Sequence, residues 1–289
     1  MSEAVKNVIR GTVPREFRNW LRSPRNSGEW LLDSLRYSLG VTRSLNILPD
    51  LRIVCHPSAY KFYRRAQMED PQQRDEFHSF VSECWPGMLL FDIGAHFGVF
   101  SIAAAKYGGR AIAVDPSPIS SRMISCQTML NSCQQQVRIL KAAVSDTSGL
   151  IGMLSSGVFT PGYLKVVKGR PRRELTTASA VTVDELTREF GAPTHLKIDV
   201  EGHEIAVLKG ARNTLEEFTP LLFLEVHNQM IVASGQDITP SLAQLRELGY
   251  DTYLSNGKLV GAAAIVREPI VRIVARHPKV LVQRREAQC

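Results

Sequence analysis

Three residues in the segment FDIGAHFG have the types and spacing needed to bind a nucleotide-like ligand. They are Asp92, Gly94 and Gly98, and they lie between an apolar run and a helix-like stretch. Glycines let the backbone turn tightly and approach a ligand, and a helix N-terminus offers unsatisfied N–H groups and the positive end of a dipole. The next apolar run ends in Asp115, where a carboxylate can accept hydrogen bonds from two ribose hydroxyls. The pattern therefore predicts a site for a cofactor that carries a ribose.

The spacing within this loop favours one cofactor over another. Dinucleotide sites use G-x-G-x-x-G, which wraps a pyrophosphate, whereas this loop reads G-x-x-x-G and is preceded by Asp92. A carboxylate in the loop would repel pyrophosphate but would suit the ammonium and sulfonium of S-adenosylmethionine. We therefore expect S-adenosylmethionine, and by analogy with the fold we expect the adenine to lie beside residues that follow the third strand. The predicted cofactor contacts are Asp92, Gly94, Ala95, His96, Phe97, Gly98, Asp115, Pro116, Ala142 and Ala143.

A second group of polar residues ends two later apolar runs, THLKIDVEG (194–202) and PLLFLEVHN (220–228). Charged residues in buried strands cost several kcal/mol to desolvate unless they are paired. Strand alternation puts Glu225 and His227 on one face, beside the neighbouring run. The predicted catalytic residues are His227, Glu225, Asp199 and Lys197.

Three interpretations of this group stay open. In the favoured one, His227 or Glu225 is a general base, a role that suits a histidine with a pKa near neutrality. In the second, Asp199, Glu225 and Asn228 hold Mg²⁺, which would lower the pKa of a bound hydroxyl. In the third, the residues are structural, for example through an ion pair of Lys197 with a carboxylate.

From Met88 onward, apolar runs alternate with helical patterns. This order predicts an α/β fold with a doubly wound, mostly parallel sheet, in which ligands bind beyond the carboxyl ends of the strands. We expect a mostly helical N-terminal appendage (1–81), a Rossmann-like domain (82–265) and a basic C-terminal tail (266–289).

The residues of both groups together resemble the FkbM family of S-adenosylmethionine-dependent methyltransferases. The resemblance rests on the glycine loop, on LKIDVEGHE (196–204) and on VLKGA (207–211), and it covers residues 88–250. Two positions depart from the family pattern: His96 replaces the usual Asn of the loop, and Val183 replaces the Leu of an earlier element. The resemblance implies a Rossmann-like fold and methylation of a hydroxyl on a small molecule, a glycan or a lipid-linked sugar.

Other functions fit the sequence less well. An N-methyltransferase and a non-catalytic S-adenosylmethionine-binding protein are the main alternatives, and the loop argues against an NAD-dependent oxidoreductase. No nucleic-acid recognition motif is present.

The composition adds expectations about partners and compartment. The chain has 289 residues, a net charge of +7 and five cysteines without a C-x-x-C pair, which favours free thiols and a cytoplasmic location. We expect no signal peptide and no transmembrane helix. The basic loop 165–173 suits an anionic acceptor, and the Arg- and aromatic-rich stretch 13–25 suits peripheral contact with an anionic membrane.

Overall fold

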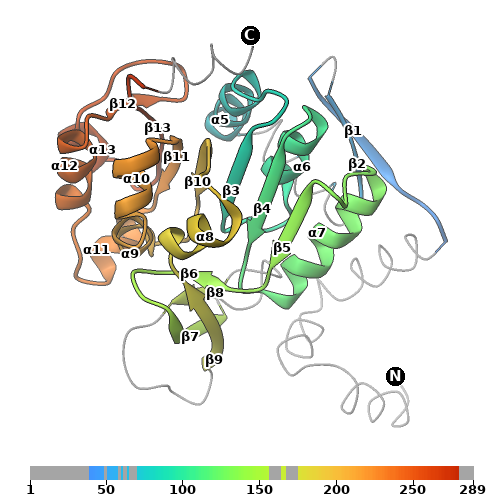
Figure 1. The fold of residues 1–289 in the computed structure, drawn as a ribbon, viewed down its shortest axis with the longest axis horizontal. Helices are drawn as coiled ribbons and strands as arrows, with labels where there is room; N and C mark the ends of the chain where they lie inside the picture. The colour runs from blue at the N-terminus through green and yellow to red at the C-terminus, as the bar shows by residue number, and fades with distance from the viewer. Residues whose placement is uncertain are drawn as a thin grey trace.

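The structure of the protein is a computed structural model, which describes residues 39–48, 51–57, 60, 64, 70–155, 164–166 and 175–279. A seven-stranded sheet forms its centre, in the order β12-β13-β11-β10-β3-β4-β5 (Figure 1). The strands are β3 (Leu89–Ile93), β4 (Arg110–Val114), β5 (Val137–Leu140), β10 (His195–Ile198), β11 (Leu221–Val226), β12 (Asp251–Leu254) and β13 (Val271–Arg276). The pairs from β11 to β5 are parallel, and β13 is antiparallel to both its neighbours. The predicted mostly parallel sheet is confirmed.

Helices pack on both faces of this sheet because its buried strands send successive side chains to opposite sides. In β3, Leu90 belongs to one hydrophobic cluster, whereas Leu89 and Phe91 belong to the other. The Leu90 face is covered by α5 (Pro71–Ser82), α6 (Val99–Lys106) and α7 (Pro118–Leu130). The opposite face is covered by α8 (Val183–Phe190), α9 (Glu204–Lys209), α10 (Arg212–Phe218), α11 (Asn228–Ala233), α12 (Thr239–Glu247) and α13 (Ala262–Ile265).

The strand order reverses between β3 and β10. From β3 the chain continues to β4 and β5 on one side, and from β10 it continues to β11 on the other. The carboxyl ends of parallel strands at such a point leave a crevice in which doubly wound proteins bind their ligands. Both groups of polar residues from the sequence analysis lie at this edge.

A second, four-stranded sheet was not predicted as a separate unit. It has the order β6-β9-β7-β8, and Figure 1 shows it below the central sheet. The segment 137–145 divides into β5 of the central sheet and β6 of this one. The strands are β6 (Ala143–Val144), β7 (Gly149–Ser155), β8 (Leu164–Val166) and β9 (Leu175–Val181).

The predicted domain boundaries need correction at both ends. Before residue 81, the described segments contain a hairpin, β1 (Arg43–Leu48) with β2 (Leu51–Cys55), and α5, whose Phe77 and Phe80 lie in the core. Near the other end, β13 lies inside the sheet, so the Rossmann-like domain extends past residue 265. The buried apolar residues of both segments explain why they join the core instead of forming appendages.

Several other expectations can be compared with the described residues. The segment 259–266 contains the short helix α13, and the segment 203–217 contains two helices, α9 and α10. Four cysteines are free thiols there, as predicted. Within the described part of the chain, no helix is long and apolar enough to cross a membrane. The stretch 13–25 and most of the basic loop 165–173 lie outside the described residues.

Candidate active site

The glycine loop joins β3 to α6 and is fixed against the end of β10. Gly94 has φ +80°, and a Cβ at this position would lie 1.8 Å from the carbonyl oxygen of Asp199. Gly98 is the N-cap of α6 and has φ +76°, in the left-handed region that favours glycine. Gly94 is therefore required both by its backbone conformation and by the close approach of the two strand ends.

Asp92, in β3, stabilises the start of α6 just after this loop. Its Oδ2 accepts hydrogen bonds from the backbone N–H and the hydroxyl of Ser101, at 3.1 and 2.6 Å, in the first turns of α6. Burial raises the pKa of Asp92 to about 6, against the lowering effect of Ser101. The structure thus gives this carboxylate the role of holding the helix start, and its predicted contact with the ammonium of the cofactor stays a prediction.

Asp115 follows β4 and also binds the loop. Its two oxygens accept one backbone N–H each, from His96 at 2.9 Å and from Ser117 at 2.8 Å. Burial raises the pKa of Asp115 to about 7, although both hydrogen bonds lower it. Because a carboxylate oxygen can accept more than one hydrogen bond, the pair of oxygens retains capacity for two ribose hydroxyls. The residues present therefore fit the ribose of S-adenosylmethionine.

The remaining predicted cofactor residues gather at the same sheet edge, but most of their side chains are packed. Ala95 and Phe97 belong to the hydrophobic core, so any contact to a cofactor would come from their backbone. The ring of His96 stacks on Phe97 with centroids 3.9 Å apart. Pro116 is half-buried, and Ala142 and Ala143, just after β5, are buried.

The second polar group forms a buried ion network. The ammonium of Lys197 lies 2.9 Å from Glu76 of α5 and 3.9 Å from both Asp199 and Glu225. Burial alone would lower the pKa of Lys197, but the charges of these three carboxylates outweigh it and raise the pKa. Since Lys197 is only 2% exposed, the geometry matches the structural interpretation of this residue better than a catalytic one.

Glu225 is held by an arginine that the sequence analysis did not assign to the site. The Arg272 guanidinium of β13 donates to both carboxylate oxygens, at 2.5 and 3.2 Å, and also lies 3.4 Å from Glu76. Burial, and then the charge of Asp199, raises the pKa of Glu225 to about 8. Two donors on its oxygens leave Glu225 poorly suited to the general-base role that was predicted for it.

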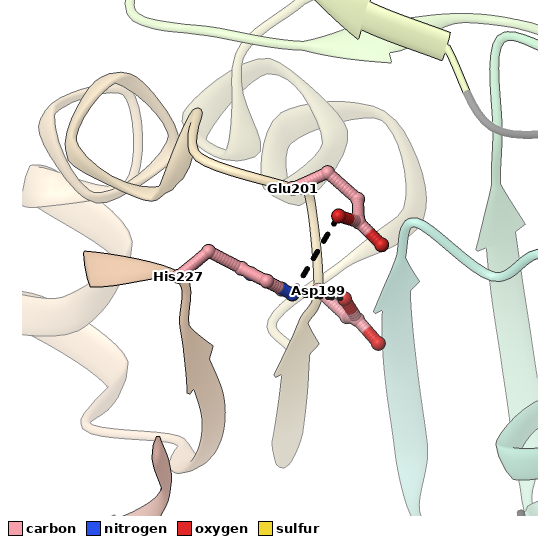
Figure 2. A group of neighbouring side chains, drawn as sticks. All are labelled: Asp199, Glu201 and His227. Carbon is pink, nitrogen blue, oxygen red and sulfur yellow. Dashed lines mark ion pairs between the residues drawn. The ribbon is translucent and has the colours of Figure 1, made fainter. Parts of the chain in front are cut away.

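His227 lies directly after β11 and faces the open side of this network. Its Nδ1 is 2.7 Å from Glu204, which is fully buried. Its Nε2 lies 3.6 Å from Glu225, 3.8 Å from Glu201 and 3.9 Å from Asp199. Burial lowers the pKa of His227, but the hydrogen bond that its Nδ1 donates to Glu204 and the charge of Asp199 raise it to about 9. Figure 2 shows the ring directed at Asp199 and Glu201.

Of the three predicted magnesium ligands, Asp199 and Glu225 lie close together, but Asn228 does not join them. The amide nitrogen of Asn228 donates to the backbone carbonyls of Ile265 and Glu268, at 2.7 and 2.8 Å, which fixes it in the α11–α13 region. Glu201 stands in its place, so that Asp199, Glu201 and His227 form the compact group. Glu201 was not among the predicted catalytic or metal-binding residues, and it lies in the turn after β10 with a φ of +52°.

Four residues that complete the site were not predicted from the sequence: Glu76, Glu201, Glu204 and Arg272. Arg272 and Glu76 come from a strand and a helix far away in the chain, and Glu204 offered only its position beside the KIDVEG segment. The residues that it did name, Lys197, Asp199, Glu225 and His227, do converge at the strand ends as predicted.

The fold and the glycine loop define a Rossmann-like methyltransferase, and comparison with known proteins specifies the family. The family model described as the methyltransferase FkbM domain matches residues 92–252, more than half of the chain. Hexuronic acid methyltransferase AglP of Haloferax volcanii is 25% identical over 177 residues, which cover 60% of this chain and 69% of that protein. The chain belongs to the FkbM family of S-adenosylmethionine-dependent methyltransferases.

Solved structures overlap with the chain only in part. The FkbM methyltransferase of Methylobacillus flagellatus has a TM-score of 0.43 and 16% identity, and the match covers 66% of this chain but only 44% of that one. A methyltransferase of Thiobacillus denitrificans, solved with S-adenosyl-L-homocysteine, has a TM-score of 0.37 and 12% identity, with 69% and 73% of the two chains covered. The family assignment therefore rests on the family model.

Proposed function

We propose that this enzyme methylates a hydroxyl group of a sugar-type acceptor, such as a hexuronic acid or a related glycan. The proposal rests on one observation above all: the polar cluster of Asp199, Glu201 and His227 lies next to the cofactor loop, because the Asp199 carbonyl touches Gly94. A methyl donor in the loop and an acceptor at the cluster would therefore be neighbours.

The chemistry of methyl transfer requires both parts of the site, the glycine loop for the methyl donor and the polar cluster for the acceptor. When bound, S-adenosylmethionine supplies a methyl group on a sulfonium; the carbon–sulfur bond breaks as the carbon–oxygen bond forms, and sulfur keeps the electron pair. Most of the rate gain in such an in-line transfer comes from proximity and orientation. The acceptor hydroxyl must also lose its proton, and the carboxylates and imidazole at the ends of β10 and β11 are the groups placed to manage it.

The sugar class follows from the chemistry of this surface and from the relative. Carboxylate oxygens accept hydrogen bonds from neighbouring hydroxyls, which a sugar offers in pairs. AglP, the relative from Haloferax volcanii, acts on a hexuronic acid according to its name. The net charge of +7 and the basic loop 165–173 suit an acidic sugar better than a cationic acceptor.

A methyl-transfer assay tests the proposal. The enzyme is incubated with S-adenosylmethionine carrying a labelled methyl group and with separate panels of hexuronic acids, neutral sugars, catechols and amines. We expect labelled product with the sugars, and a large loss of kcat in Asp199→Asn while S-adenosyl-L-homocysteine still binds. The matched control is Asp251→Asn, an exposed aspartate at the start of β12. Transfer to amines alone, or to none of the sugars, would contradict the proposal.

A further inference from the structure

Asp199, Glu201 and His227 have the geometry of a metal-binding group. They come from the end of β10, the turn after it and the end of β11, and one ligand atom from each lies within 4.8 Å of the other two. Two ligands of one cation, each about 2.1 Å from it, are about 3 to 4 Å apart. The separations of 3.8 and 3.9 Å from His227 Nε2 to the two carboxylates fall in this range.

The imidazole of His227 is oriented as a metal ligand would be. Its side chain is almost fully buried, and its Nδ1 is held by Glu204 at 2.7 Å. Among the described residues, Nε2 makes no hydrogen bond, because its closest carboxylate oxygens, 3.6 to 3.9 Å away, are too distant for one. Metal-binding histidines have this arrangement, in which a carboxylate holds one ring nitrogen and directs the other at the ion.

The cluster is also open to solvent on one side. The side chains of Asp199 and Glu201 are 34% and 19% exposed, whereas that of His227 is 4% exposed. A cation bound here would have three protein ligands and further positions for water or for an acceptor oxygen. Two carboxylate oxygens and one imidazole nitrogen suit Mn²⁺ or Mg²⁺, since carboxylates favour these ions and imidazole favours the transition metals.

We propose that Asp199, Glu201 and His227 bind one divalent cation, of the Mn²⁺ or Mg²⁺ class, and that Glu204 positions the histidine for it. This inference rests on the proposed function and deepens it. A sugar hydroxyl that enters the open coordination positions would be held beside the cofactor loop, and the cation would lower the pKa of that hydroxyl. The cation itself undergoes no change in oxidation state.

Binding of Mn²⁺ to the enzyme without cofactor or acceptor tests the site directly. Free Mn²⁺ gives a sharp six-line electron paramagnetic resonance spectrum that weakens when the ion is bound. We expect saturable binding of one Mn²⁺ per chain, displaced by Mg²⁺, with affinity reduced at least about tenfold in Glu201→Gln. Glu201 is the preferred position for the variant because it is partly exposed and lies in a turn, so its replacement leaves the core intact.

Matched controls separate this site from general surface charge. Glu189→Gln removes an exposed glutamate of α8, and it should bind Mn²⁺ as the unmodified enzyme does. His227→Asn should lose the ion, whereas His78→Asn, on the exposed side of α5, should keep it. Circular dichroism melting of each variant shows whether the chain is folded.

The result also distinguishes this inference from the proposed function. If the enzyme binds no Mn²⁺, or if Glu201→Gln binds it equally well, the metal site is wrong even when sugars are methylated. If Mn²⁺ binds as expected but no sugar is methylated, the proposed function is wrong and the metal site stands.

Discussion

The two halves of the site lie at one sheet edge but are held together by different interactions. At the cofactor half, Asp92 and Asp115 accept hydrogen bonds from backbone and hydroxyl groups that lie 2 to 19 residues away in the chain. At the acceptor half, Lys197 and Glu225 are held by opposite charges from α5 and β13, elements at nearly opposite ends of the described chain. The first half is built locally, and the second depends on the complete fold.

This difference predicts how substitutions in each half affect folding and binding. Loss of a neutral hydrogen bond costs about 1 kcal/mol, whereas loss of one member of a buried ion pair leaves its partner uncompensated and costs about 3–5 kcal/mol. Substitutions at the acceptor half should therefore affect folding, and those at the cofactor half should mainly affect binding. Gly94 is the exception, because it touches both halves.

The largest effect is expected for Gly94→Ala. The new Cβ would lie 1.8 Å from the Asp199 carbonyl oxygen at a φ of +80°, so the loop and the end of β10 must move apart. A left-handed conformation alone costs about 1–3 kcal/mol in such a residue, and the backbone overlap adds to it. We expect calorimetry to show binding of S-adenosyl-L-homocysteine weakened by about a hundredfold or more, with methyl transfer lost.

Gly235→Ala is the matched control for this variant. Gly235 has a similar φ of +74°, but a Cβ there would meet nothing within 4 Å. It should lose some stability through backbone strain while binding the cofactor product normally. Equal effects of the two substitutions would show that the contact between the two halves is unimportant.

The second largest effect is expected for Lys197→Met, which removes the cation at the centre of the acceptor half. Among the described residues, Glu76, Asp199 and Glu225 would then lie close together with Arg272 and His227 as the remaining cationic groups beside them. We expect the free energy of unfolding, measured by denaturant titration, to fall by about 3–5 kcal/mol. The control Lys258→Met, at an exposed position, should change it by less than about 0.5 kcal/mol. A small change in Lys197→Met would mean that the network contributes little to the fold.

The same contrast explains what the sequence could predict. The glycine loop, Asp115 and the mostly parallel sheet follow from short patterns, because each depends on residues close together in the chain. The convergence of Asp199 with His227 was predicted too, since the carboxyl ends of neighbouring parallel strands must meet. Glu76 and Arg272 could not be assigned, because nothing local tells a helical glutamate or a strand arginine which buried charge it will meet.

Two further predictions, the end of the domain and the position of the Asn228 side chain, were wrong because the sequence pattern fits more than one structure. The residues of β13 read VRIVAR, and because the same alternation occurs in an exposed tail and in a sheet strand, the predicted domain boundary at 265 lies too early. Asn228 follows the same strand as His227, yet the start of α11 turns its amide toward the carbonyls of Ile265 and Glu268. The direction of a side chain after a strand end depends on the turn that follows, which the spacing does not specify.

The smallest expected effect is a pH dependence that belongs to the cofactor half. Burial raises the pKa of Asp115 to about 7, and only the ionised carboxylate can accept hydrogen bonds on both oxygens from the ribose. The affinity for S-adenosyl-L-homocysteine should therefore rise with pH up to about 7 and then level off, with a loss that approaches about tenfold per pH unit below it.

The raised pKa also has a consequence for folding, with the opposite sign. The protonated Asp115 carboxyl is favoured more in the native state than in the unfolded chain, where its pKa has the ordinary value of 3.8. The contribution of Asp115 to the free energy of unfolding therefore falls as the pH rises from 3.8 toward its native pKa of about 7. Calorimetric titrations between pH 5 and 8 check the binding effect, and Asp115→Asn should bind weakly with a flat profile. A slope that persists in Asp115→Asn would assign the titration to another group, such as Asp92, whose pKa of about 6 is also raised by burial. The pH dependence of cofactor binding would then come from Asp92, which stabilises the start of α6, instead of from the contact of Asp115 with the ribose.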